Sequence, residues 1–303
     1  MDLFEMRQIG KTDMRASALA LGGGWLAPPD QDDSVGINLV RRALEMGINY
    51  IDTSPSYWES ERLIGEALVG VSRESYYLST KVGTHPDRPK DYSPASLRWS
   101  AQQSLKQLNV DYFDILLIHD PTEEDVEAIL APGGGLDEMV QMRDEGLTRY
   151  IGIGVRSHEW HKRAIETGKT DVMLTYMDYT LVNQSAAQDI LPLAAQRGVG
   201  VILGSPLAGG LLGGREPDDA KLPRDWRDQF EAAHAMWQWC KDRGRCVRDF
   251  AIQFCLALPM QGVVLSGPRN VRELQEVVDS ATKPIPQELW DEFQREFGIV
   301  PAR

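Results

Sequence analysis

Four residues with acid–base chemistry lie at or just after the ends of apolar segments of this chain. Asp52, Lys81 and His119 each stand at or beside the end of such a segment, and Tyr57 follows Asp52 in the next loop. A free tyrosine has a pKa of about 10, so by itself it exchanges protons poorly at neutral pH. A neighbouring ammonium group lowers that pKa, and a carboxylate holds the ammonium in place. We therefore predict that Asp52 and Lys81 make Tyr57 a general acid and base, with His119 binding the same substrate oxygen.

Each of these residues, taken alone, also suits a structural role. Asp52 can cap a turn, and Lys81 can extend from a strand end to solvent. A tyrosine such as Tyr57 often packs with its hydroxyl in water, and His119 can be a hydrogen-bonded histidine at the rim. Their joint placement at the ends of successive strands is what favours catalysis.

Short apolar segments alternate with amphipathic ones along the chain, as expected for parallel strands buried on both faces. The predicted strands are 18–23, 50–53, 76–82, 113–119, 150–155, 171–176, 200–205 and 262–266. The predicted helices between them are 34–46, 60–69, 94–108, 136–145, 158–167, 186–196, 226–242 and 247–258. This order predicts a (β/α)₈ barrel of the TIM type with its active site at the C-terminal ends of the strands. An open dinucleotide-binding sheet would need a G-x-G-x-x-G motif after its first strand, which Gly22-Gly23-Gly24-Trp25 does not supply.

Two segments lie outside the repeat. Residues 6–17 predict an N-terminal hairpin that plugs the bottom of the barrel. Residues 287–297 predict an extra C-terminal helix with an apolar face. The composition stays uniform along all 303 residues. We therefore predict a single domain over residues 1–303.

The composition excludes several functional classes. A formal net charge of −13 disfavours binding to nucleic acid or to anionic membranes. The three cysteines show no C-x-x-C spacing, and no secretory leader or membrane-spanning run precedes them, so we predict reduced thiols and a cytoplasmic protein. His158 and His161 share a helix face without a third ligand at metal spacing, and we predict no metal site.

The motifs around the four acid–base residues resemble those of the aldo-keto reductase superfamily over nearly the whole chain. Residues 52–65 resemble the family's Asp and Tyr signature, residues 79–82 its lysine strand and residues 110–119 its histidine strand. The resemblance implies an oxidoreductase that moves a hydride between NAD(H) or NADP(H) and a carbonyl or alcohol. Tyr57 is then the proton donor or acceptor and His119 the orienting residue.

The same resemblance assigns cofactor contacts in three groups. The pyrophosphate loop comprises Ser205, Pro206, Leu207, Gly209 and Leu211; the adenosine end comprises Ser266, Gly267, Arg269, Asn270 and Glu273; the nicotinamide contacts are Tyr179, Asn183 and Ser157. Arg269 or Arg272 suits a 2′-phosphate, whereas an acidic Glu273 suits the ribose hydroxyls of NAD. The preference between NADP(H) and NAD(H) therefore stays open.

The residues expected around the substrate indicate a sugar or a similar polar molecule. Trp25 and Trp58 can wall a pocket for a sugar or a small polar aldehyde. Asp120-Pro121, Arg156-Ser157 and residues 178–186 resemble the branch with galactose, fucose and threo-aldose dehydrogenases. Aldehyde reduction and oxidation of an aldose at C1 both stay open, as does monomer versus homo-oligomer.

Two other functions compete with this one. The first is a regulatory barrel subunit that binds the cofactor without physiological catalysis. The second is a metal-dependent barrel hydrolase that uses His119, Asp120 and Asp178.

Overall fold

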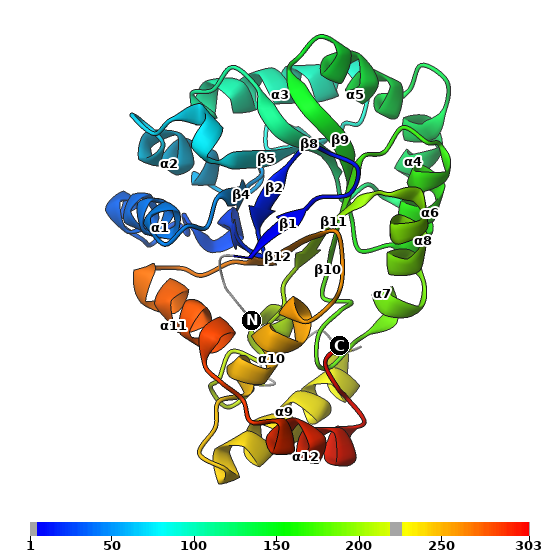
Figure 1. The fold of residues 1–303 in the computed structure, drawn as a ribbon. Coiled ribbons are helices and arrows are strands. Elements are labelled where there is room, and N and C mark those ends of the chain that lie inside the picture. Colours follow the sequence, from blue (N-terminus) through cyan, green and yellow to red (C-terminus); the bar gives the residue numbers. More distant parts are fainter. Residues whose placement is uncertain (1–4, 219–225, 303) are drawn as a thin grey trace.

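Eight parallel strands close into a barrel in the computed structural model, which describes residues 5–218 and 226–302 (Figure 1). The barrel strands are β3 (Leu19–Gly22), β4 (Tyr50–Asp52), β5 (Tyr77–Val82), β8 (Phe113–His119), β9 (Thr148–Gly154), β10 (Val172–Tyr176), β11 (Gly200–Gly204) and β12 (Gly262–Ser266). They follow one another around the barrel in chain order, and β12 pairs with β3 to close it. The predicted TIM-type barrel and all eight of its strands are confirmed.

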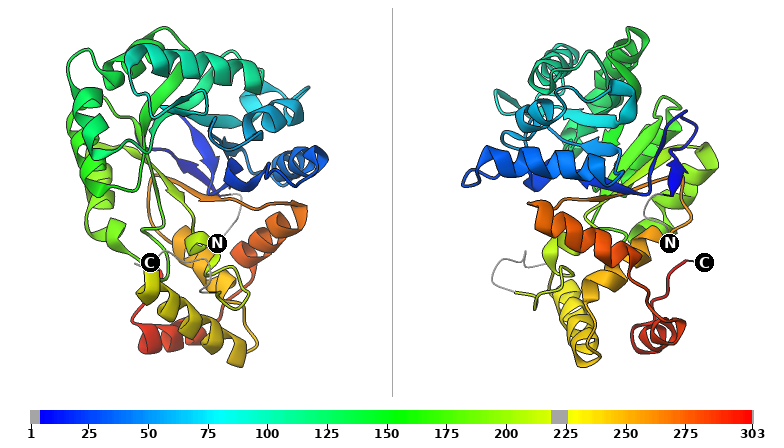
Figure 2. Two further views of the ribbon diagram at one scale, coloured as in Figure 1. Left: turned by 180° about the vertical axis from the view of Figure 1, so that it is seen from behind. Right: turned by 60° about the vertical axis from the view of Figure 1, so that its left-hand side comes forward.

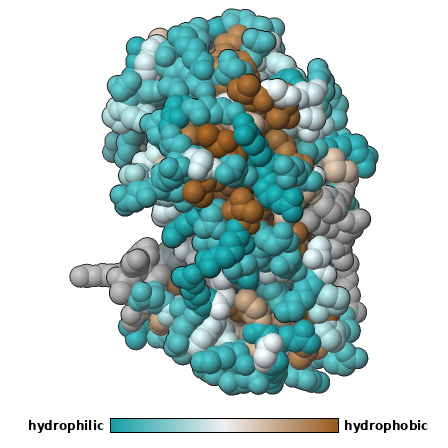
Figure 3. Space-filling view, turned by 90° about the vertical axis from the view of Figure 1, so that its left-hand side faces the viewer, coloured by the Kyte–Doolittle hydropathy of each residue, from teal (hydrophilic) through white to brown (hydrophobic). Residues whose placement is uncertain are grey.

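Helices surround the barrel and cover the outer faces of the strands (Figure 1). They are α1 (Asp33–Glu45), α2 (Ser60–Ala67), α3 (Pro94–Leu108), α4 (Glu123–Leu130), α5 (Gly135–Asp144), α6 (His158–Glu166), α7 (Ser185–Gln188), α8 (Ile190–Arg197), α10 (Val247–Leu256) and α11 (Val271–Thr282). Their apolar residues face the strands, so the side of the molecule that carries α1, α2 and α11 is largely hydrophilic, with some hydrophobic residues visible at the surface (Figure 3).

The sequence prediction missed two helices and a small hairpin. Helix α4 begins at a capping box in which Thr122 and Asp125 satisfy each other's backbone N–H groups. Helix α11 occupies a segment that was assigned only as a cofactor loop. The two-stranded hairpin of β6 (Thr84–His85) and β7 (Arg88–Pro89) follows β5. The single helix predicted over 186–196 is divided into α7 and α8 at Asp189.

The N-terminal hairpin of β1 (Met6–Gln8) and β2 (Arg15–Ser17) seals the barrel from below. Ile9 and Met14, in its turn, are fully buried and pack with the residues that fill the barrel interior, such as Tyr50. The hairpin turn is also anchored by backbone hydrogen bonds, from Gly10 N to Gln261 O and from Lys11 N to Gly198 O. The predicted plug at the barrel bottom is confirmed.

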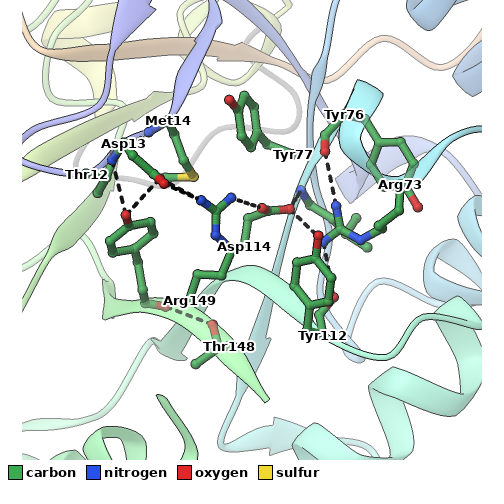
Figure 4. A network of polar contacts seen from close by, with 12 residues as sticks. Thr12, Asp13, Met14, Arg73, Tyr76, Tyr77, Tyr112, Asp114, Thr148 and Arg149 are labelled. Atoms are coloured by element: carbon green, nitrogen blue, oxygen red, sulfur yellow. Dashed lines mark hydrogen bonds and ion pairs between the residues drawn. The ribbon is translucent and has the colours of Figure 1, made fainter. Parts of the chain in front are cut away.

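A network of charged groups joins this hairpin to the barrel wall (Figure 4). The carboxylate of Asp114, on β8, accepts hydrogen bonds from Arg73 at 2.7 Å and Arg149 at 2.9 Å, and from the backbone N–H of Leu78 at 2.8 Å. Arg149 also donates to both oxygens of Asp13 in the hairpin, at 2.6 and 2.8 Å. We name Asp114, Arg73, Arg149 and Asp13 the bottom network.

The last helix packs outside the ring of helices. Helix α12 (Gln287–Phe297) lies beside α9 (Arg227–Asp242), as both views of Figure 2 show. Trp290 and Phe293 are buried and make edge contacts with Trp239 and Phe250. The predicted extra C-terminal helix is confirmed, because its aromatic face is the one that is buried. No helix in the described part of the chain is long and apolar enough to cross a membrane.

Candidate active site

A cleft of about 770 Å³ opens at the C-terminal ends of the barrel strands. All four predicted acid–base residues line it: Asp52 ends β4, Lys81 lies in β5, His119 ends β8, and Tyr57 stands in the loop between β4 and α2. Because the strands are parallel, their C-terminal ends meet at one rim, and residues far apart in the chain become neighbours. The structure therefore brings the four residues together.

Lys81 and Asp52 form a buried ion pair on the cleft floor. Lys81 Nζ donates to Asp52 Oδ2 at 2.6 Å and to the carbonyl oxygen of Thr53 at 2.7 Å, and both charged side chains are at most 3% exposed. The other carboxylate oxygen of Asp52 accepts from Ser79 Oγ at 2.7 Å. Burial disfavours the charge of Lys81, but Asp52 and Tyr57 outweigh it and raise the pKa of Lys81. The lysine is thus held as an ammonium ion.

The half-buried Tyr57 lies against this pair, with Lys81 Nζ 4.7 Å from the centre of its ring. Burial raises the pKa of Tyr57, and the positive charge of Lys81 lowers it by less. The net direction corrects the sequence prediction, which expected Lys81 to bring the pKa down. The phenol is therefore a protonated group at neutral pH, with an ammonium ion placed to stabilise its conjugate base.

His119 completes the cleft floor as a neutral imidazole. Its ring meets that of Tyr57 edge-on at 5.7 Å between centres. Nδ1 lies 2.7 Å from Thr84 Oγ1 and 3.2 Å from Ser54 Oγ. Burial, assisted by the charge of Lys81, holds the pKa of His119 well below its ordinary value. Thr84 belongs to the hairpin that the sequence prediction missed.

Most of the predicted phosphate and adenosine contacts line the rest of the cleft. They are Ser205, Pro206, Leu207, Gly209, Ser266, Gly267, Arg269 and Glu273, with Arg272. The adjacent Gly210 also lines the cleft, and its φ of 104° is a backbone conformation that favours glycine. Four arginines stand along the same cleft, Arg215, Arg248, Arg269 and Arg272. Backbone N–H groups of a glycine-rich loop beside guanidinium groups fit the phosphates of a nicotinamide dinucleotide.

The predicted nicotinamide contacts lie elsewhere. Tyr179 is buried, with its ring stacked on Phe254 at 5.0 Å, so it cannot lie against a ring in the cleft. Asn183 is committed to the loop, where its Nδ2 donates to Met177 O. Ser157 is the N-cap of α6 and accepts from Trp160 N. None of the three lines the cleft, and these assignments are corrected.

Three further predicted residues stand behind or beside the cleft wall. Leu211 is buried beneath the loop, and Asn270 caps α11 by accepting from Glu273 N at 3.0 Å. Trp58 is 48% exposed and lies outside the cleft lining, although its ring is 5.8 Å from that of Trp25. Trp25 itself lines the cleft, as predicted.

The structure adds residues that the sequence prediction did not assign to the site. Tyr176 ends β10 and lines the cleft, in the region where Tyr179 was expected. Strand-end position alone could have identified it. Arg248 reaches the cleft from α10 and is held by Glu276 at 2.7 Å and by the carbonyl oxygen of Gly213 at 3.2 Å. Nothing in the local sequence around Arg248 signals this role.

The residues proposed for a metal-dependent hydrolase, His119, Asp120 and Asp178, do not all come together in the structure. Asp178 does not line the cleft, and its carboxylate accepts from His158 at 3.1 Å. His161 Nε2 lies 2.8 Å from the carbonyl oxygen of Val155, so the two histidines have separate partners. Within residues 5–218 and 226–302, no group of three or more His, Cys, Asp or Glu side chains is arranged to hold a metal ion.

Comparison with known proteins places the chain among oxidoreductases. The profile of the Aldo/keto reductase family matches residues 18–295. The L-galactose dehydrogenase of Arabidopsis thaliana is 33% identical over 298 residues, with 93% of this chain and 90% of that protein covered. The D-threo-aldose 1-dehydrogenase of a Pseudomonas species is 27% identical over 295 residues, with 87% and 88% covered. The solved glycerol dehydrogenase of Gluconobacter oxydans superposes with a TM-score of 0.77 at 25% identity, covering 100% of this chain and 98% of that one.

Proposed function

Because the chain belongs to the aldo/keto reductase family and is thereby an NAD(P)-dependent oxidoreductase, we propose that it interconverts a sugar or small polar aldehyde with its oxidised or reduced partner. The observation that carries this proposal is the buried Lys81–Asp52 pair beside Tyr57 in the cleft at the C-terminal ends of the strands. A bound nicotinamide would supply or accept the hydride. The residues of the chain would handle the proton.

Tyr57 is the proposed proton donor for reduction and acceptor for oxidation. In reduction its hydroxyl gives a proton to the carbonyl oxygen of the substrate, and a phenolate is left behind. An ammonium ion has three N–H groups, and those of Lys81 have two acceptors in Asp52 and Thr53. The third remains for the phenolate, which Lys81 stabilises as it forms.

His119 is the proposed orienting group for the substrate oxygen. Its Nδ1 accepts a hydrogen bond from Thr84 in this assignment, so the ring proton lies on Nε2. The depressed pKa keeps the ring neutral, and Nε2–H then donates to the substrate oxygen without competing with Tyr57 as an acid.

Two observations support a polar, sugar-like substrate. Trp25 offers a 48% exposed aromatic face on the cleft wall, which suits the C–H face of a sugar. The two similar proteins described above, an L-galactose dehydrogenase and a D-threo-aldose 1-dehydrogenase, are sugar dehydrogenases by name. The same cleft would serve aldehyde reduction and oxidation of an aldose at C1, since the proton path through Tyr57 runs in either direction.

The experiment is a turnover assay that follows the absorbance of reduced nicotinamide. NADH and NADPH are paired with a panel of small aldehydes, and NAD and NADP with a panel of aldoses. Turnover of at least one panel is the expected result. Cofactor binding measured by fluorescence, with no turnover in any combination, would contradict the proposal and favour a regulatory barrel that binds cofactor without catalysis.

A further inference from the structure

Asp120 is an acidic residue in the cleft that the proposed proton transfer does not use. It directly follows His119 at the end of β8 and lines the same cleft as Tyr57, and 43% of its side chain is exposed. Its backbone is held on both sides: the N–H donates to Gly154 O at 2.8 Å, and the carbonyl oxygen accepts from Tyr92 at 3.0 Å. The carboxylate is therefore presented to the cleft from a fixed point.

The conformation of Asp120 is itself unusual. Its φ is 40°, in the left-handed region that residues with a side chain seldom adopt. Such strain persists only where the surrounding structure enforces it, and it gathers at functional sites. The hydrogen bonds to Gly154 and from Tyr92 provide that enforcement.

The carboxylate of Asp120 retains unused acceptor capacity. It accepts from the hydroxyl of Tyr176, at 3.2 and 3.3 Å to its two oxygens. Oδ2 lies 3.6 Å from His119 Nε2, which is beyond hydrogen-bond distance. In the described ranges no lysine or arginine comes within ion-pair distance of it. A carboxylate has about four acceptor positions, so those that Tyr176 does not use have no protein donor among the described residues.

We propose that Asp120 is a specificity-determining residue whose carboxylate accepts a hydrogen bond from the substrate hydroxyl next to the reacting carbon. This inference rests on the proposed function. With the substrate oxygen on His119 Nε2, a hydroxyl on the neighbouring carbon comes within reach of Asp120 Oδ2, because the two protein atoms are only 3.6 Å apart. The substrate class is thus a neutral 2-hydroxyaldehyde or aldose. A carboxylate or phosphate at that position is repelled.

The test compares two aldehydes of equal chain length, propanal and 2-hydroxypropanal. The measured quantity is the ratio of kcat/KM for 2-hydroxypropanal to that for propanal, in the wild-type protein and in Asp120→Asn. Asparagine is isosteric and tolerates a positive φ, so the backbone is kept. We expect the ratio to fall by about 10- to 100-fold, the factor that corresponds to a charged hydrogen bond. Asp111→Asn, an exposed residue at the other end of the segment, controls for the change in net charge.

The outcomes separate this inference from the function on which it rests. No turnover of either aldehyde by the wild-type protein would reject the proposed aldehyde chemistry. Turnover of both, with the same ratio in wild type and Asp120→Asn, would overturn the role of Asp120 alone. A second substrate tests the charge: the kcat/KM of glyoxylate relative to propanal should rise in Asp120→Asn, and an unchanged value would likewise count against the assignment.

Discussion

The barrel carries a cluster of charges around a buried carboxylate at each end, and the two clusters are completed differently. At the N-terminal end the Asp114 carboxylate is saturated by donors from the protein, namely Arg73, Arg149 and the backbone N–H of Leu78. Arg73 is further enclosed between two tyrosine rings, with its guanidinium 4.0 Å from the centre of Tyr112. The charged groups of this bottom network are paired with one another and hold the fold together.

At the C-terminal end the cluster is left incomplete on one side. Asp52 and the carbonyl oxygen of Thr53 take two of the N–H groups of Lys81, and the third is available toward Tyr57. Burying a charge costs several kcal/mol, and well-placed partners must offset that cost. The comparison teaches that the two ends use the same chemistry for different purposes: the saturated cluster serves stability, and the incomplete one serves reactivity.

The largest effect is expected from Tyr57→Phe, which should reduce turnover strongly while leaving stability unchanged. Without the hydroxyl the proton cannot be passed to the substrate, so kcat should fall by about 10² to 10⁴. Cofactor affinity and melting temperature should stay near wild type, because the ring and its packing are retained. Turnover followed at the reduced-nicotinamide band measures this, with fluorescence titration for the cofactor. Near-wild-type turnover would refute the proton role of Tyr57.

The opposite result is expected from Asp114→Asn in the bottom network. The two arginines lose their shared counter-charge, which for a buried pair costs about 3 kcal/mol of unfolding free energy. Equilibrium unfolding in urea measures this loss, and Asp111→Asn is the exposed control on the same segment. Turnover per folded molecule should remain within about twofold of wild type. A large loss of turnover without loss of stability would break the division between the two ends.

Arg269, in the part of the cleft assigned to the adenosine end of the cofactor, is expected to influence the choice between NADP(H) and NAD(H). Arg269 lies with its guanidinium 4.8 Å from the centre of the Trp25 ring, and no carboxylate is within ion-pair distance of it among the described residues. If it contacts a 2′-phosphate, Arg269→Ala should weaken NADP(H) binding by about 10- to 100-fold and NAD(H) binding much less. Isothermal titration with both cofactors measures the difference. Equal losses would assign Arg269 to a contact that the two cofactors share.

A buried carboxyl behind the cleft predicts a pH-dependent stability. Glu61, on α2, accepts from Thr80 at 2.6 Å, and burial raises its pKa to about 7. The folded state therefore binds a proton that the unfolded state releases at lower pH, so the contribution of Glu61 to stability is greatest below about pH 4.5 and is lost as the pH rises through about 7.

Glu61→Gln removes this titration while keeping an acceptor for Thr80. Relative to wild type, its free energy of unfolding should increase by about 1–2 kcal/mol between pH 5 and pH 8, because wild type loses stability over that range and the variant does not. Urea unfolding at the two pH values measures the change. A constant difference across that range would show that Glu61 titrates normally.

The smallest effect is expected from Tyr150→Phe, a matched tyrosine substitution at the barrel bottom. Tyr150 donates to Asp13 at 2.8 Å, so its loss should lower the unfolding free energy by about 1 kcal/mol. Turnover should not change. Loss of turnover comparable to that of Tyr57→Phe would mean that the two ends of the barrel are coupled.

The sequence correctly predicted the site residues whose position depends on strand order. It did not predict those whose position depends on the path of a loop. Asp52, Lys81 and His119 were found because each sits at the end of an apolar strand, and parallel strands share one rim. Tyr179 was misplaced because Met177, with a φ of 64°, turns the chain directly after β10. That turn sends Tyr179 into the core and leaves Tyr176 at the cleft, and a single sequence does not reveal a positive φ at methionine.

Long-range contacts were the other limit. Thr84 contacts His119 from the short hairpin that follows β5, and Arg248 reaches the cleft from an outer helix. The net direction of the Tyr57 pKa also depends on how tightly the cleft floor is packed. Residue types predicted the partners of Tyr57 but not that burial would outweigh them.

The N-terminal hairpin that plugs the barrel bottom has a consequence for folding during synthesis on the ribosome. Gly10 is bonded to Gln261, Lys11 to Gly198 and Asp13 to Arg149, so the hairpin leaves the ribosome long before its partners exist. Its side chains Ile9 and Met14, which are buried in the folded protein, can reach their packing partners only after the later barrel strands have been synthesised. The hairpin is therefore made before its partners and is among the later segments to reach its native place, and a barrel interrupted before residue 261 stays open at its base.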